Sequence, residues 1–256
     1  MSAGRSSPFA GRRVAITGAS GSLGRELLRA FHSCGASLVA LTTSSEPLQL
    51  MSASGDPIPL EQRSWRCGQE AELSELLSHI DILVINHGIN AHADRSAAAL
   101  ERSLEVNALS SIRLLELFAS AAQDPNGSVK PGPGEPPRRE VWINSSEAEI
   151  LPAVSPLYEI SKRLLGQLIS LRAFDLAGPK LRIRRLVLGP FRSNLNPIGV
   201  MGATFVAQAV LRLAAWDWGL IIVTPNPLTY VLMPLVALIR WIYMGLFSRP
   251  GHQSPA

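Results

Sequence analysis

Thr17-Gly-Ala-Ser-Gly-Ser-Leu-Gly24 is the stretch that decides the fold. It follows a short apolar run, Val14-Ala-Ile16, and opens a segment whose apolar residues recur at helical spacing. In such a turn, Gly18 allows the tight bend, Gly21 allows a pyrophosphate to approach the backbone and Gly24 lets the helix pack on the sheet. The free N–H groups at the start of the helix would then meet the anion. The stretch therefore predicts a dinucleotide-binding turn.

Strand and helix patterns alternate along the rest of the chain. Apolar runs typical of buried strands occur at Ser37–Leu41, Asp81–Ile85, Val141–Ile143 and Leu186–Leu188, and a long helical pattern covers 97–122. Repeated strand–helix units predict an α/β fold, a Rossmann-like doubly wound parallel sheet flanked by helices in a single domain.

The chain divides into three expected regions. Residues 1–11 carry arginines but no apolar stretch typical of a secretory signal, so we expect a flexible N-terminal arm. Residues 12–224 are expected to form the dinucleotide-binding domain, and 225–256 an apolar C-terminal segment and tail. Within the domain, 123–139 holds five prolines and three glycines, which predicts an exposed loop insertion.

Composition excludes several classes of protein. The net charge is +4, and its basic residues are scattered in short pairs, so we expect a solvated surface and no nucleic-acid partner. The two cysteines and five histidines show no metal-ligand spacing, so we expect no metal site. A reduced, cytoplasmic protein is the simplest interpretation.

Tyr158 and Lys162 form the candidate catalytic pair. Residues four apart lie on one face of a helix. An ammonium beside a phenol lowers the pKa of the phenol, which predicts a proton donor in this position.

The glycine turn and the Tyr158–Lys162 pair together resemble the short-chain dehydrogenase/reductase (SDR) family, over about residues 12–224. The turn matches the TGxxGxxG form found in atypical branches, with Ser22 where the commoner form has glycine. Ile85-Asn86-His87-Gly88 is similar to the family's NNAG motif, and Asn107 matches its helix-borne active-site asparagine.

The resemblance also assigns catalytic roles. Tyr158 would exchange the proton with the substrate oxygen, and Lys162 would hold the nicotinamide ribose and lower the pKa of the tyrosine. A serine would hold the substrate oxygen, and Asn107 would anchor a water in the proton relay. Ser145 has the common family spacing of thirteen residues to Tyr158, whereas Ser146 is the second serine of its pair; both are candidates, with Ser146 favoured.

The resemblance places the cofactor contacts on the glycine turn and after the strands. Leu188–Ser193 is similar to the family's PGPVxT segment, which touches the nicotinamide carboxamide. The expected contacts are Thr17, Gly18, Ser20, Gly21, Ser22, Leu23, Gly24, Thr42, Thr43, Asn86, Gly88, Tyr158, Lys162, Gly189 and Ser193.

The choice of cofactor depends on the residues that follow the second strand. NAD-binding proteins usually place an acid there, whereas this chain has the hydroxyls of Thr42 and Thr43. NADP is therefore favoured over NAD, with Arg25 and Arg13 as the arginines expected to approach a phosphate from the turn.

Residues 228–247 are nearly all apolar, interrupted by Pro234 and Arg240. A bilayer-spanning helix needs about 20 apolar residues with few charges. The central arginine and the aromatic residues near it favour a helix at a membrane surface. A helix that covers a substrate cleft or a dimer face, and a true span, are the alternatives.

The leading hypothesis is an NAD(P)-dependent oxidoreductase that interconverts a carbonyl and an alcohol on a hydrophobic, lipid-like substrate. Residues 141–245 also resemble the dehydrogenase half of bacterial chains that carry a sterol-desaturase-like module. The alternative is a catalytically silent dinucleotide-binding sensor or a membrane-surface interaction protein. By resemblance, the helices over 97–122 and 156–177 would pair copies into a homodimer or homotetramer, in the cytoplasm or on the cytoplasmic face of a membrane.

Overall fold

The computed structural model describes residues 7–123, 138–193 and 195–249. Its seven parallel strands form one sheet in the order β3-β2-β1-β4-β5-β6-β7. The strands are β1 (Arg13–Thr17), β2 (Ser37–Thr42), β3 (Glu61–Ser64), β4 (Ile82–Ile85), β5 (Arg139–Ser146), β6 (Leu181–Leu188) and β7 (Leu220–Val223). The order reverses between β1 and β4, where parallel sheets open a ligand crevice. The predicted single-domain Rossmann-like fold is confirmed.

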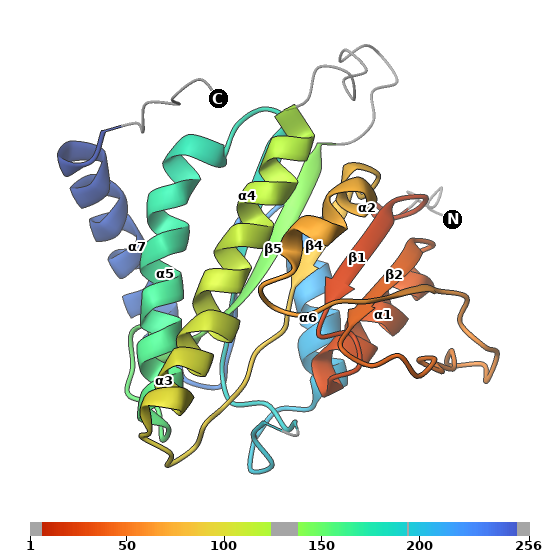
Figure 1. Ribbon diagram of the computed structural model, residues 1–256, viewed down its shortest axis with the longest axis horizontal. Helices are drawn as coiled ribbons and strands as arrows, with labels where there is room; N and C mark the ends of the chain where they lie inside the picture. Colours follow the sequence, from red (N-terminus) through yellow and green to blue (C-terminus); the bar gives the residue numbers. More distant parts are fainter. Residues whose placement is uncertain (1–6, 124–137, 194, 250–256) are drawn as a thin grey trace.

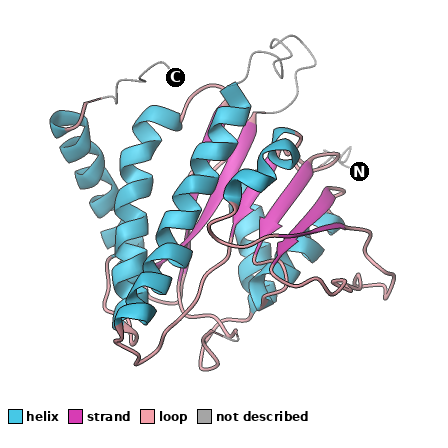
Figure 2. Cartoon of the chain, viewed as in Figure 1, coloured by secondary structure: helices cyan, strands magenta, loops and turns pink. Residues whose placement is uncertain are grey.

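Helices cover both faces of the sheet (Figures 1 and 2). One face packs against α1 (Ser22–Ser33) and α6 (Ala203–Ala215); the other packs against α2 (Ser74–Ser78), α4 (Ser110–Gln123) and α5 (Pro156–Leu176). The central strand β4 is apolar and buried on both faces, as a sheet covered on two sides requires.

The predicted helix over 97–122 is not continuous. α3 (Ala97–Leu104) passes through a π-helical turn, Glu105–Leu109, before α4 begins. Such turns hold an extra residue and occur often at functional sites. Asn107 lies inside this one.

Residues 7–11, which were predicted to belong to a flexible arm, pack on the domain. Phe9 is 3 % exposed, and its ring packs edge-on against Phe31 and Trp142, with centroids 5.4 and 5.7 Å away. Burial of this aromatic side chain joins residues 7–11 to the domain. Residues 1–6 of the predicted arm and 124–137 of the predicted loop insertion lie outside the described residues.

The apolar C-terminal segment forms one helix, α7 (Pro227–Phe247), which lies along α5 (Figure 1). Trp241 stacks on Phe174 of α5 with ring centroids 6.4 Å apart. By length and composition α7 could cross a bilayer: its most apolar stretch of 18 residues has a mean hydropathy of 1.7, and 11 % of that stretch is buried.

Candidate active site

The glycine turn forms a cradle at the carboxyl end of β1. Gly18 has a φ of +61°, and a Cβ there would lie 2.9 Å from the Cα of His87. A Cβ on Gly24 would lie 2.3 Å from the carbonyl oxygen of Gly18. Gly21 is the N-cap of α1 and has no side chain to occupy the N–H groups of the first turn. The space and the free N–H groups of this cradle fit the pyrophosphate of a dinucleotide.

Thr17 joins the ends of β1 and β4 beneath this cradle. Its hydroxyl oxygen accepts hydrogen bonds from the backbone N–H groups of Asn86 and His87, at 2.8 and 3.2 Å. Asn86 in turn accepts a bond of 2.9 Å from the side chain of Asn144 on β5. The bonds tie three neighbouring strand ends into one crevice floor.

Polar groups also gather where β2 ends. Thr42 donates to the hydroxyl of Ser20 at 3.2 Å, and Arg25 donates to the Ser20 carbonyl at 3.0 Å. Thr43 is exposed beside them. Arg13 lies at the opposite end of β1 and pairs with Glu61 at 2.5 Å, so the expectation that it approaches the cofactor is wrong.

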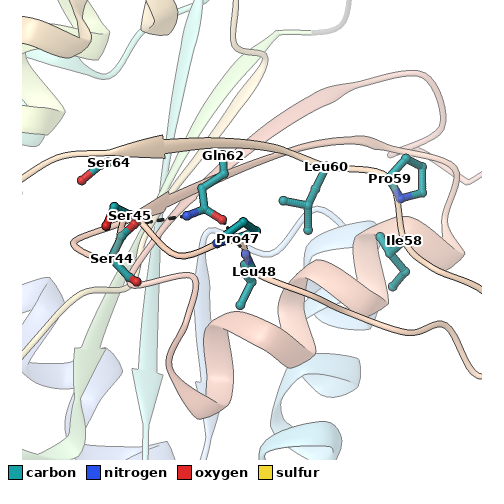
Figure 3. Close-up of a pocket in the computed structure, with 9 residues that line it drawn as sticks. All are labelled: Ser44, Ser45, Pro47, Leu48, Ile58, Pro59, Leu60, Gln62 and Ser64. Atoms are coloured by element: carbon teal, nitrogen blue, oxygen red, sulfur yellow. Dashed lines mark hydrogen bonds between the residues drawn. The ribbon is translucent and has the colours of Figure 1, made fainter.

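A hollow lies beyond Thr42, along the β2–β3 edge of the sheet (Figure 3). Gln62 of β3 closes its floor by donating to the carbonyls of Ser44 and Glu46, at 3.1 and 2.8 Å. Its lining is Ser44, Ser45, Pro47, Leu48, Ile58, Pro59, Leu60, Gln62 and Ser64. The hollow borders the end of the crevice where Thr42 lies, away from Tyr158.

The structure separates the two candidate serines at the end of β5. The Ser146 side chain lies near the hydroxyl of Tyr158, where it opposes the rise that burial causes in the pKa of that phenol, and the Ser146 oxygen accepts from Ala148 N–H at 3.2 Å. Ser145 turns away and donates to the carboxylate of Glu149. Ser146 is therefore the serine that faces the tyrosine.

Lys162 lies behind Tyr158, with its amine 5.7 Å from the centre of the phenol ring. The amine donates to the Asn144 carbonyl at 3.1 Å. Burial lowers the pKa of Lys162 to about 8, opposed by the carboxylate of Glu149. The residue is therefore poised to exchange its proton near neutral pH.

The predicted lowering of the tyrosine pKa is not found. Burial raises the pKa of Tyr158, the hydrogen bond from Ser146 opposes this rise, and the charge of Glu147 adds to it. The prediction considered only the ammonium. Inside the crevice, desolvation penalises the phenolate and the ammonium alike, and Lys162 directs its hydrogen bond to a carbonyl.

Asn107 is fully buried and locks the loop after β4. Its side-chain oxygen accepts from the N–H of Ile89 at 2.8 Å, and its amide donates to the Ile89 carbonyl at 2.9 Å. The amide also donates to Ser161 of α5 at 2.9 Å. A Cβ on Gly88 would lie 3.2 Å from the Asn107 oxygen, so glycine keeps this approach close.

The remaining predicted cofactor residues occupy different settings. Gly189 follows β6, where a Cβ would lie 2.2 Å from the hydroxyl of Thr224. The Ser193 hydroxyl accepts from Asn196 N–H within its own loop, at 3.2 Å. Leu23 is buried in the core, which leaves only its backbone for a ligand, whereas Ser22 is partly exposed at the start of α1.

Sequence reasoning missed the acidic residues that follow Ser146. Glu147 accepts from the hydroxyls of Thr224 and Thr229, at 2.6 and 3.2 Å. Glu149 pairs with Arg240 of α7 at 2.8 Å. Their partners lie 77 to 91 residues away along the chain, so no local pattern signals these contacts.

Comparisons with known proteins agree with this geometry. The sequence profile of the family described as short chain dehydrogenase matches residues 12–198. The chain is 41 % identical to a monoglucosyldiacylglycerol epimerase of Synechocystis over 239 residues, which cover 93 % of this chain and 55 % of that protein. It is 26 % identical to human L-xylulose reductase over 207 residues, covering 78 % of this chain and 76 % of the reductase. The chain thus spans about half the length of the cyanobacterial relative.

Two solved structures share the fold. A short chain dehydrogenase from Burkholderia cenocepacia, in complex with NADP, aligns with a TM-score of 0.71 and 18 % identity, over 94 % of this chain and 99 % of its own. The ligand-free aldohexose dehydrogenase of Thermoplasma acidophilum aligns with a TM-score of 0.66 and 17 % identity, over 98 % and 100 % of the two chains.

The fold and the family match define an NAD(P)-dependent enzyme class. The chain belongs to the short-chain dehydrogenase/reductase family, as the glycine turn and the Tyr158–Lys162 pair predicted.

Proposed function

We propose that the protein is an NAD(P)-dependent oxidoreductase that interconverts a secondary alcohol and a carbonyl on a lipid that carries a sugar. One arrangement carries this proposal: the Tyr158 hydroxyl meets Ser146, with the Lys162 amine behind it, in the crevice that begins at the glycine cradle. A bound dinucleotide would supply a hydride acceptor or donor at this point.

Four residues would bind the substrate oxygen and move its proton. Ser146 and Tyr158 would hold the oxygen through hydrogen bonds. In the oxidising direction, Tyr158 as phenolate would take the hydroxyl proton while the carbon loses hydride; in the reducing direction Tyr158 would return the proton. Lys162, with its pKa near 8, would stabilise the phenolate and pass the proton onward. Asn107 would anchor a water in the relay from the loop that it locks.

A sugar-bearing lipid matches the surroundings of the crevice. A hollow with a mixed lining borders the loop that Asn107 locks: Asn90, Asp94 and Arg102 lie among apolar residues such as Ile89 and Leu195. Val154, Ile198 and Val200 project from loops at the same end of the sheet and are 99, 85 and 73 % exposed. The cyanobacterial relative is named for a glycolipid. An epimerase of this class would oxidise one sugar carbinol and then reduce the ketone from its other face.

The proposal is tested with monoglucosyldiacylglycerol and either NADP⁺ or NAD⁺. Conversion to an epimer, or appearance of reduced cofactor at 340 nm, supports it. Turnover of small polar sugars alone would reject the lipid substrate. Tight cofactor binding without any turnover would support the catalytically silent sensor instead.

For the cofactor we propose NADP over NAD. Arg25 and the hydroxyls of Ser20 and Thr42 form a cationic, acid-free group at the end of β2. A 2′-phosphate would find charge-assisted donors there, whereas the ribose hydroxyls of NAD would find no carboxylate.

We also propose that α7 lies on a lipid surface at the cytoplasmic side of a membrane. Its one charged residue, Arg240, is turned inward, and its outer side presents Leu235, Leu238 and Ile242, which are 46–52 % exposed. A L235S/L238S/I242S variant should lose co-flotation with phosphatidylcholine vesicles, whereas Trp216→Ser, at the C-cap of α6, should not. If the wild type instead runs as a dimer or tetramer in light scattering and the triple variant as a monomer, α7 is a contact between copies.

A further inference from the structure

The loop after Ser146 is held by a buried group of charges. Glu149 is fully buried, and its carboxylate accepts from Ser145 on β5 and from Arg240 on α7, the latter at 2.8 Å. Arg185 of β6 lies 3.5 Å from the same carboxylate and also donates to the Gly166 carbonyl at 3.1 Å. Four elements thus meet at one side chain.

α5 leaves room for this group. A Cβ on Gly166 would lie 1.9 Å from the nearer Glu149 oxygen and 2.9 Å from the Arg240 guanidinium. Because Gly166 has no side chain, the ion pair between Glu149 and Arg240 can pass over α5 one turn after Lys162. The space is therefore fitted to the carboxylate and its partner from α7.

The same loop is held at its start. Glu147 accepts from Thr224 and from Thr229, which is fully buried in the first turn of α7. Both ends of the short 3₁₀ helix η4 (Glu147–Glu149) are thereby tied to α7 or to the residues that lead into it. Ser146, which faces Tyr158, is the N-cap of that helix.

We propose that Glu149 is a positioning residue of the active site: held by Arg240, it sets the placement of Ser146 and the charge of Lys162. This inference rests on the proposed roles of Ser146 and Lys162. It makes α7 a part of the catalytic architecture, because the helix supplies the cation that keeps Glu149 in place.

The charge on Lys162 reports directly on this arrangement. The titratable groups around its amine are Glu149 on η4, His87 after β4 and Tyr158 on α5, and Arg240 acts through Glu149. Glu149 favours the ammonium. Removing the carboxylate should lower the lysine midpoint, whereas removing Arg240 should raise it, since Arg185 still keeps Glu149 ionised.

A lysine titration tests this without any substrate. The chain has only three lysines, Lys130, Lys162 and Lys180, so side-chain ¹³C NMR resolves them after assignment by Lys→Arg variants. Glu149→Gln should move the Lys162 midpoint down by about one pH unit, and Arg240→Met should move it up. Glu140→Gln is the control, because Glu140 forms a buried pair with Arg184 at 2.6 Å at the far end of β5 and should leave the midpoint unchanged.

Opposite shifts in the two variants are the signature of an electrostatic role. General loosening of the fold would move both midpoints in the same direction, and that result, or no shift in either variant, overturns the inference. If Glu149→Gln fails to fold, Arg240→Met is compared with Glu140→Gln, which breaks a different buried pair: an upward shift in Arg240→Met alone supports the inference, and an equal shift in both variants overturns it. NADPH binding by the wild type is measured separately by fluorescence. If the wild type does not bind NADPH, the proposed function is rejected, and the lysine titration still decides the role of Glu149.

Discussion

Replacing Gly166 by alanine should destabilise the protein, although alanine is the better helix former. The new Cβ would lie 1.9 Å from a carboxylate oxygen of Glu149, 2.4 Å from its carboxyl carbon and 2.9 Å from the Arg240 guanidinium. None of these groups has free space to move into, because Glu149 is fully buried and Arg240 nearly so. The helix must shift, or the ion pair must break.

The magnitude follows from three contributions. Overpacking a core by a methyl group costs about 1–3 kcal/mol. Loss of one partner of a buried ion pair costs about 3–5 kcal/mol, which sets the upper limit if the pair separates. Replacing glycine in a helix returns about 1 kcal/mol. We expect a net loss of about 3 kcal/mol in the free energy of unfolding, or roughly 6–12 °C in Tm.

Thermal and urea denaturation measure this loss, with Gly245→Ala as the matched control. Gly245 lies in α7, where a Cβ would meet Phe174 at an ordinary 3.5 Å, so alanine should leave stability unchanged or raise it. In a Glu149→Ala background, Gly166→Ala should cost nothing further, because the obstructing carboxylate is gone. Equal effects of both glycine substitutions, or an undiminished cost in that background, would refute the steric reasoning.

Three further predictions concern chemistry, cofactor and pH. Tyr158→Phe should lower kcat by about 10²–10⁴-fold while NADPH still binds, because the proton donor alone is removed; retained turnover would place the proton transfer elsewhere. Arg25→Ala should weaken NADPH binding by about 10-fold or more and NADH binding little, in fluorescence titrations. Burial lowers the pKa of His87 to about 4 from 6.5, so the unfolded chain binds a proton that the folded chain excludes. The free energy of unfolding should therefore fall between about pH 6.5 and pH 4, by up to about 1.4 kcal/mol per pH unit, and His87→Asn should flatten this slope in urea titrations.

The parts of the fold predicted from the sequence are those with local physical signals. The glycine turn carries its own backbone requirements, and the central strands are apolar on both faces, so both could be located. β3 escaped prediction because Glu61-Gln-Arg-Ser64 is polar, as an edge strand with little burial can be. Its pairing with β2 is a long-range property of the sheet.

The residues of the candidate site likewise fall into those that local spacing predicts and those whose contacts depend on distant parts of the chain. Tyr158 and Lys162 share a helix, so their spacing predicted that they would lie on one face. The side to which Arg240 points could not be predicted, because its partner Glu149 is 91 residues away along the chain. The arginine in the apolar segment was interpreted as a sign of an interfacial helix, whereas it serves the interior of the domain.

The π turn at Glu105–Leu109 has a consequence for protein engineering. An α-helix advances about 100° per residue, and the π turn takes up one extra residue, so removing one residue here would let a regular helix run through with α3 and α4 kept close to their present faces, while residues inside the turn change face. Asn107 would swing off the loop after β4, while the sheet, which contains none of these residues, would keep its strand order. A single-codon deletion could thus abolish turnover and leave the circular dichroism spectrum almost unaltered.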